Sequence, residues 1–227
     1  MEIRPIADFH SPFGTKFGIP RQSGIIPELE GKIVFRPEYR NAEALRGLEE
    51  FDYLWLIWEF SANRGDSGTW SPTVRPPRLG GNARIGVFAS RSPFRPNGLG
   101  LSAARILRIE RDGPEGPVIH VSGADLMDGT PVYDIKPYVT YADSRPDARS
   151  GFVDANSWST LEVIIPSGIA AKLPEKARKM ISGVLAQDPR PQYHDDPEKI
   201  YGMEFDGMDV RFRVHDGIAE VTEIIKK

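Results

Sequence analysis

The fold is constrained most by a series of short apolar segments separated by tight-turn signals. Six such segments are expected to be β-strands: residues 2–6, 32–35, 52–62, 101–109, 118–122 and 132–138. The last three are separated by Asp112-Gly113 and Asp128-Gly129, and Asp-Gly pairs favour the two-residue turns of antiparallel hairpins. Asn41 is expected to cap a helix that continues through Glu49. Many short strands with such turns predict a mainly β fold, either a barrel or a sandwich.

A change of pattern after residue 140 predicts a domain boundary. The stretch YADSRPDARSG at 141–151 is polar and rich in turn-forming residues, so we divide the chain into domains 1–146 and 147–227. The second domain is expected to hold a strand at 161–165, a helix at 174–186, and hairpin turns at Asp206-Gly207 and Asp216-Gly217. These elements predict a small α+β domain.

The composition excludes several functional classes. No cysteine occurs among the 227 residues, so disulfides, thiolate metal sites and thiol nucleophiles are excluded. The four histidines are scattered along the chain, which predicts no metal site. The first residues lack the apolar run of a secretory signal, and no apolar stretch approaches the roughly 20 residues that cross a bilayer. We therefore expect a cytoplasmic protein that makes no use of a membrane.

Positive charge is concentrated in one segment. The whole chain has a formal net charge of −3, yet residues 75–111 hold eight arginines and one acid, Glu110. Arginine without lysine suits bidentate contacts with phosphate or carboxylate and stacking on nucleobases. Arg78, Arg91 and Arg95 lie among prolines and glycines, where irregular backbone can approach a ligand closely. The arginines of the following strand are expected to pair with surface acids: Arg105, Arg108 and Arg111.

Acidic residues gather around the second Asp-Gly turn, at Asp125, Asp128 and Asp134. Turn chemistry alone accounts for Asp128. A carboxylate and free backbone amides in such a loop could hold ribose hydroxyls, an adenine edge or an ammonium group. The residues by themselves therefore indicate an arginine-rich site for an anionic or nucleotide-like ligand.

Four segments together carry a resemblance to a known family. They are IPRQSG (19–24), RPPRLGGNARIGVFASRSPFRPNGLG (75–100), GADLMDGTPVYDIKPY (123–138) and LAQDPRPQY (185–193). With these segments the chain resembles the TsaA-like (TrmO) family of tRNA methyltransferases over nearly its whole length. The resemblance implies a single-sheeted β-barrel that binds S-adenosyl-L-methionine in the first domain. It also implies a second domain that aids tRNA recognition, and a homodimer.

The same resemblance implies a reaction and a set of site residues. The substrate would be tRNA carrying N6-threonylcarbamoyladenosine at position 37, methylated on the exocyclic amine of that base. The matching cofactor contacts are Pro20, Arg21, Gln22, Ser61, Ala62, Arg91, Leu101, Leu126, Met127, Asp128 and Gly129. The candidate substrate contacts are Arg78, Arg95, Lys136 and Tyr138. Asp134, Lys136 and Tyr138 are candidates to accept a proton or to orient the base, and no catalytic base is assigned.

Two other functions remain open at this point. A non-catalytic RNA-binding protein would use the same arginines, together with Arg211 and Arg213 on one face of the final hairpin. A methyltransferase for a small acidic substrate would use the same barrel. Binding of S-adenosyl-L-methionine separates the first alternative from the enzyme, and methyl transfer to tRNA separates the second. Because the cofactor motifs precede residue 147, cofactor binding is expected to survive removal of the second domain.

Overall fold

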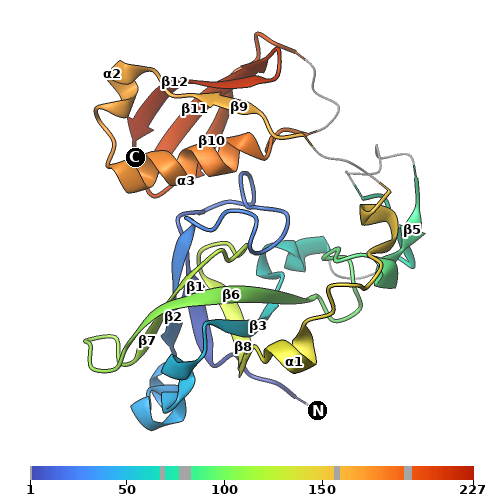
Figure 1. The fold of residues 1–227 in the computed structure, drawn as a ribbon, viewed down its shortest axis with the longest axis vertical. Coiled ribbons are helices and arrows are strands. Elements are labelled where there is room, and N and C mark those ends of the chain that lie inside the picture. The colour runs from blue at the N-terminus through green and yellow to red at the C-terminus, as the bar shows by residue number, and fades with distance from the viewer. Residues whose placement is uncertain (1, 67–69, 77–82, 156–158, 192–195) are drawn as a thin grey trace.

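The N-terminal part of the chain is a closed β-barrel (Figure 1). The computed structural model describes residues 2–66, 70–76, 83–155, 159–191 and 196–227. The barrel strands are β1 (Ala7–His10), β2 (Glu30–Phe35), β3 (Tyr53–Glu59), β6 (Leu99–Glu110), β7 (Val118–Ser122) and β8 (Thr130–Pro137). All neighbours pair antiparallel, in the order β1-β2-β7-β6-β3-β8. The prediction of a mainly β fold with a barrel is confirmed.

Alternation of side chains along the strands fills the barrel interior. In β3, Leu54, Leu56 and Trp58 are buried, while the residues between them are more exposed. Because successive side chains of a strand point to opposite faces, one face of β3 lies in the core. β3 pairs with both β6 and β8, as each strand of a closed barrel has two neighbours.

Short elements connect the barrel strands and follow the last of them. They are η1 (Pro37–Tyr39), η2 (Ala42–Leu45), η3 (Leu48–Glu50), η4 (Ser61–Asp66), β4 (Thr73–Val74), β5 (Ile85–Gly86), η6 (Val87–Ala89), α1 (Thr140–Asp143) and η7 (Gly151–Val153). The strands β4 and β5 form a small separate ribbon. The arginines Arg75, Arg84, Arg91 and Arg95 flank this ribbon and η6 in the sequence.

Two expectations for the first fifty residues are wrong. The expected strand at 2–6 is not formed, and β1 begins one residue later; Pro5 has no backbone N–H to donate to a partner strand. The single helix expected after Asn41 is two short 3₁₀ helices. Asn41 does accept a hydrogen bond from the backbone N–H of Glu43, at 3.0 Å. Gly47, at φ +84°, then breaks the helical conformation between η2 and η3.

The C-terminal part is a four-stranded sheet with a helix packed on it. Its elements are β9 (Glu162–Ile164), α2 (Ser167–Ala170), α3 (Glu175–Ala186), β10 (Tyr201–Phe205), β11 (Met208–His215) and β12 (Ile218–Lys226). The sheet order is β10-β11-β12-β9, with β9 parallel to β12 and the other pairs antiparallel. Both expected Asp-Gly turns have positive φ at both residues, which is typical of type I′ hairpins.

One loop of the first part belongs to the core of the second. Residues 11–28, between β1 and β2, lie between the barrel and α3 (Figure 1). Phe13 and Ile26 from this loop are buried in the same apolar cluster as Ile181 and Phe205 of the C-terminal part. The Phe13 and Phe205 rings meet edge-to-face with centroids 5.5 Å apart. The loop is therefore packed by both parts, and the domain boundary after residue 146 stays a prediction.

The helices in the described ranges are short. The longest of them, α3, has 12 residues. No helix in these ranges combines the length and the apolar character needed to cross a bilayer.

Candidate functional site

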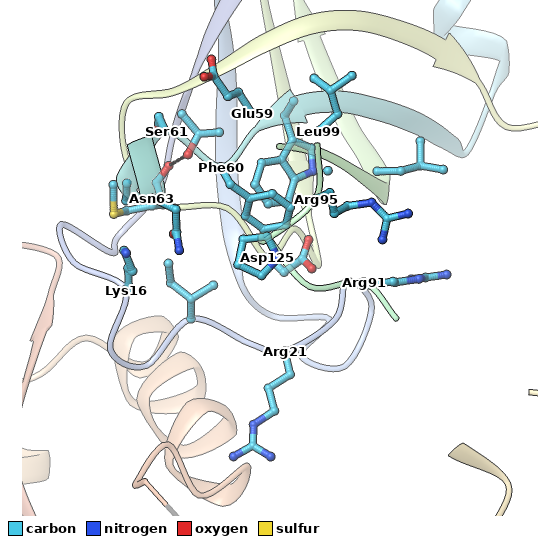
Figure 2. A pocket seen from close by; sticks show the side chains of 18 of the residues that line it. Lys16, Arg21, Glu59, Phe60, Ser61, Asn63, Arg91, Arg95, Leu99 and Asp125 are labelled. Atoms are coloured by element: carbon cyan, nitrogen blue, oxygen red, sulfur yellow. Dashed lines mark hydrogen bonds between the residues drawn. The ribbon is translucent and has the colours of Figure 1, made fainter. Parts of the chain in front are cut away.

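A cavity of about 500 Å³ opens beside the barrel (Figure 2). Its walls come from loop 11–28, the end of β3 with η4, residues 90–95, the start of β6, and the segment that leads into β8. These segments are far apart in sequence and meet because the barrel closes. The volume falls within the range of roughly 300 to 1,000 Å³ typical of small-molecule and cofactor sites.

A partly buried carboxylate lies at the centre of this cavity. Asp125 accepts a hydrogen bond of 2.5 Å from the Ser102 hydroxyl, which in turn accepts one of 3.0 Å from the Trp58 indole N–H. Ser102 is 1% exposed and Trp58 is 6% exposed, so this hydrogen-bonded chain is shielded from water. Burial is the largest influence on Asp125 and raises its pKa, while the Ser102 hydrogen bond and the charge of Arg91 oppose that shift.

The Trp58 ring reaches Ser102 because its strand neighbour is glycine. Trp58 and Gly100 are partners in the β3–β6 pairing. A Cβ atom built on Gly100 would lie 2.3 Å from the Trp58 ring, which is closer than real Cβ contacts. Gly100 thus permits the ring to lie flat against β6. The Phe60 ring packs on Trp58 at a centroid distance of 4.3 Å and extends the apolar wall.

Arginines form the polar rim of the cavity. Arg91 donates a hydrogen bond of 2.6 Å to the Gln22 side-chain oxygen, which joins the arginine-rich segment to loop 11–28. Arg21 also lines the cavity, and in Figure 2 its side chain extends away from Asp125. Arg95 lines the cavity and donates from Nη1 to the backbone oxygens of Val87 and Ser90, at 3.2 and 2.6 Å. Arg95 thereby holds η6 against the rim.

The structure brings most of the expected cofactor contacts together. Eight of the eleven line the cavity: Pro20, Arg21, Gln22, Ser61, Ala62, Arg91, Leu101 and Met127. Leu126 points into the barrel core instead. Asp128 accepts a hydrogen bond from the backbone N–H of Ser11 and contacts His10 Nδ1, both at 3.1 Å. Gly129, at φ +73°, supplies the turn before β8.

Of the four expected substrate contacts, Arg95 alone is placed at the cavity among the described residues. Arg95 lines the cavity, whereas Arg78 lies outside the described residues. Lys136 is six residues along β8 from Thr130, which lines the cavity, and this spacing corresponds to about 20 Å of strand. Lys136 pairs with Asp134 at 2.9 Å, and the Tyr138 ring packs on Trp55. The structure therefore places Lys136 and Tyr138 at the end of β8 remote from the cavity.

Several residues of the site were not among the expected contacts, and Asp125, Trp58 and Gly100 are the most informative of them. Asp125 was noted only as one of several acids near a turn, and its burial depends on Ser102, which is 23 residues away. Trp58 falls within an expected strand, and Gly100 immediately precedes the expected strand 101–109. No local signal distinguishes them, because their proximity arises from strand register.

The described residues offer no candidate metal site. No group of three or more histidine, aspartate or glutamate side chains in these ranges has the arrangement to hold a metal ion. His194 lies outside the described residues.

The fold and cavity define a class: a closed β-barrel with a cofactor-sized pocket, a partly buried carboxylate within it and arginines at its rim. Comparison with known proteins identifies the family. The family described as tRNA-methyltransferase O N-terminal domain matches residues 8–144, and the TrmO C-terminal domain matches residues 159–227. The chain belongs to the TrmO family of tRNA methyltransferases, and the family predicted from the four sequence segments is confirmed.

Relatives and solved structures agree with this assignment. The tRNA (adenine(37)-N6)-methyltransferase of Escherichia coli is 38% identical over 228 residues, covering 97% of this chain and 96% of that enzyme. A Pseudomonas aeruginosa relative, 40% identical over 226 residues and covering 92% of this chain and 91% of its own length, has a name that refers to S-adenosylmethionine-dependent methyl transfer. A crystal structure of TrmO superposes with a TM-score of 0.79 at 32% identity, covering 99% of both chains.

Proposed function

We propose that the protein transfers the methyl group of S-adenosyl-L-methionine to the exocyclic amine of N6-threonylcarbamoyladenosine at position 37 of tRNA. One observation carries the proposal. A cofactor-sized cavity is lined by eight of the eleven residues that the family resemblance assigns to the cofactor, although these residues come from distant segments. Membership of a tRNA methyltransferase family supplies the reaction class.

The chemistry of the lining residues fits this cofactor. Phe60, Trp58 and Leu101 offer apolar surface for the adenine ring and for the methylene groups beside the sulfonium. The Asp125 carboxylate has acceptor capacity beyond its Ser102 hydrogen bond and can bind ribose hydroxyls or the ammonium group. Arg91 at the rim can bind the amino-acid carboxylate. The cavity thus offers an acceptor and a cation of matching chemistry for the polar parts of the cofactor.

The chain's own residues have a positioning task. Bound S-adenosyl-L-methionine supplies an electrophilic methyl group, so the protein needs no nucleophile of its own. The apolar wall of Trp58 and Phe60 would shield a bound cofactor from water on one side, and the Ser102–Asp125 hydrogen bond fixes the direction of the carboxylate. Holding two reactants in one geometry accounts for a large part of many enzymatic rate accelerations.

The threonylcarbamoyl group gives the substrate base a carboxylate of its own. An arginine at the mouth of the cavity would pair with that carboxylate, and Arg95 is the candidate among the described residues. Its Nη1 already bonds two backbone oxygens, and its guanidinium has five N–H donors in all. The remaining donors are sufficient for a bidentate contact.

The non-catalytic RNA-binding alternative loses two of its arginines. Arg211 pairs with Asp209 and Glu223, and Arg213 donates two hydrogen bonds to Glu220, at 2.9 and 2.8 Å. These acids neutralise the face of the final hairpin that was to contact RNA.

We further propose that the protein acts in the cytoplasm as a homodimer. Light scattering of the purified chain would test whether it is a dimer.

The decisive test is chemical. Nucleosides from the tRNA of cells with and without this protein are compared by mass spectrometry. We expect a loss of one methyl group on N6-threonylcarbamoyladenosine when the protein is absent, and its return when the purified protein and S-adenosyl-L-methionine are added. Unchanged nucleosides in both experiments would refute the proposed function.

A further inference from the structure

A second, larger hollow adjoins the cofactor cavity. Its volume is about 1,300 Å³, and its walls come from residues 71–76, residues 84–94 and residues 150–153. We call it the arginine groove. It shares Arg21, Gln22, Phe60, Ser90, Arg91 and Pro93 with the cofactor cavity, so the two hollows lie side by side with common walls. A ligand in the groove would therefore extend to the place where methyl transfer is proposed.

The arginine groove is lined by positively charged side chains and by no acidic side chain. Arg21, Arg75, Arg84 and Arg91 line it, and its lining residues include no aspartate or glutamate. In the described ranges none of these four guanidinium groups forms an ion pair, unlike Arg108 and Arg111 of the same segment. Four exposed cations around one hollow favour an extended polyanion.

Aromatic rings are held exposed on the same surface. Phe88 is 70% exposed and Phe94 is 46% exposed, and both line the groove. The Trp70 ring stacks on Phe88 with centroids 6.2 Å apart and an interplanar angle of 28°. The Arg95 guanidinium lies 5.7 Å from the Phe88 ring centre, and buried Val87 anchors the adjoining residue of η6. Phe88 is therefore an ordered platform at the surface.

Rings that alternate with arginines are the means by which proteins bind single-stranded nucleic acid. Bases stack on the rings, and the cations contact the phosphates. We infer that the arginine groove binds the unpaired nucleotides that flank the target adenosine in the anticodon loop, with bases on Phe88 and Phe94 and phosphates on Arg75 and Arg84. This inference rests on the proposed function for the identity of the RNA. The four residues that it assigns to RNA do not line the cofactor cavity.

A protein partner fits this surface less well. The centres of protein interfaces are depleted of charged side chains, whereas here four arginines surround the rings. A second copy of the chain that docked symmetrically through this face would bring like charges together, because such an interface pairs each patch with itself. The positive charge of the groove thus favours RNA over a second copy of the chain as its occupant.

The test measures binding of a synthetic anticodon stem-loop, without cofactor, by fluorescence anisotropy. Phe88→Ala and Phe94→Ala should each lower affinity about tenfold, since a stacked base contributes roughly 1 to 3 kcal/mol. Arg84→Ala should reduce the slope of log affinity against log salt concentration by about one, while Phe88→Ala leaves this slope unchanged. Matched controls are Phe51→Ala and Arg105→Ala, which replace exposed residues outside the groove.

Two further measurements separate the possible outcomes. S-adenosyl-L-methionine affinity should stay at the wild-type value in Phe88→Ala and Phe94→Ala, because neither ring lines the cofactor cavity. Stem-loop affinity equal to that of the controls would overturn the inference, as would a dimer that dissociates in these variants while RNA binding is retained. A wild-type protein that binds the stem-loop through these residues but transfers no methyl group would refute the proposed function and leave the groove assignment intact.

Discussion

The Ser102 hydroxyl donates a hydrogen bond of 2.5 Å to the Asp125 carboxylate from the neighbouring wall of the cavity. The serine lies on β6 and the aspartate in the segment between β7 and β8, so the contact exists only in the closed barrel. Ionisation of Asp125 therefore affects the stability of the fold, because a carboxylate that is largely removed from water is costly to ionise.

Asp125→Asn should change how stability depends on pH. Burial raises the Asp125 pKa in the folded state above the ordinary aspartate value of about 3.9. The folded protein therefore holds the Asp125 carboxyl proton more tightly than the unfolded chain does. The contribution of Asp125 to the free energy of unfolding falls as pH rises from the unfolded-state pKa through the higher folded-state pKa. Asparagine does not titrate there, so the stability of the variant relative to wild type should improve as pH rises from acid to neutral.

Urea unfolding at a series of pH values measures this effect. The other acids titrate equally in both proteins and cancel in the difference. Ser102→Ala serves as a companion, because removing the hydrogen bond that favours the ionised form should raise the Asp125 pKa further. If the wild-type and Asp125→Asn stability curves run parallel over this range, the carboxylate is not held in the state described.

Arg91→Ala should weaken cofactor binding. Arg91 lines the cavity and bonds Gln22, so it contributes to the site directly and through the loop that carries Gln22. Loss of one charge-assisted contact costs about 1.5 to 3 kcal/mol, which corresponds to roughly tenfold or more in affinity. Isothermal calorimetry with S-adenosyl-L-methionine measures the change. Arg105→Ala is the control, since it removes an exposed arginine of the same segment outside the cavity, and equal affinities in the two variants would contradict the assignment.

Phe13→Ala should damage the cofactor site from a distance. Phe13 is fully buried against Phe205 in the C-terminal core, and its loop continues to the cavity residues Pro20 and Gln22. Truncation of a buried phenylalanine costs about 3 to 5 kcal/mol. We expect lower stability and weaker binding of S-adenosyl-L-methionine, measured by urea unfolding and calorimetry, with Phe51→Ala as an exposed control.

This packing changes an expectation drawn from the sequence. Cofactor motifs confined to the first 146 residues suggested that the barrel alone would retain cofactor binding. Removal of the C-terminal part would expose Phe13, Ile26 and Leu29, which pack in its core. A chain ending near Ser150 should therefore lose much of its cofactor affinity. Full affinity in that shortened chain would show that loop 11–28 keeps its conformation unaided.

Local signals predicted the elements that local forces determine. The strand expected at 118–122 is a short, mainly apolar run bounded by turn residues, and β7 has the same limits. The Asp206-Gly207 turn forms because both residues accept positive φ. The helix expected from Pro174 to Ala186 is α3, with Pro174 as the residue before its first turn, where the missing N–H has no cost. In each case the residues that decide the structure are within a few positions.

Features that depend on distant residues could not be predicted in this way. The cavity joins Gln22 to Arg91, which are 69 residues apart, and no local pattern states that they meet. The family resemblance identified both residues, because matching a family motif assigns a role to a position without any knowledge of how the chain folds. Lys136 and Tyr138 were proposed from the chemistry of their side chains, and the structure places them at the remote end of β8, about 20 Å of strand away from the cavity.

The preference for modified tRNA should depend on an arginine at the mouth of the cavity. An arginine positioned for the threonylcarbamoyl carboxylate is left desolvated and unpaired when the base is unmodified, at a cost of roughly 1 to 3 kcal/mol or more. Wild-type protein should therefore methylate tRNA that carries this group about tenfold or more faster, at low substrate concentration, than the same tRNA transcribed in vitro. A protein that only neutralised the phosphate backbone would show no such difference.

Arg95→Ala tests which arginine is responsible. Arg95 lines the cavity without contacting Gln22, so this variant should lose the preference for modified tRNA while it still binds S-adenosyl-L-methionine. Because Arg95 also bonds the backbone oxygens of Val87 and Ser90, Arg95→Lys is a needed companion: lysine keeps a charge but lacks the planar fork for a bidentate contact. A preference retained in both variants would exclude Arg95 and leave Arg78, the other candidate, to be replaced in the same assay. Equal rates on both tRNAs with the wild-type protein would withdraw the modified base as substrate and leave methylation of adenosine 37 itself to be tested.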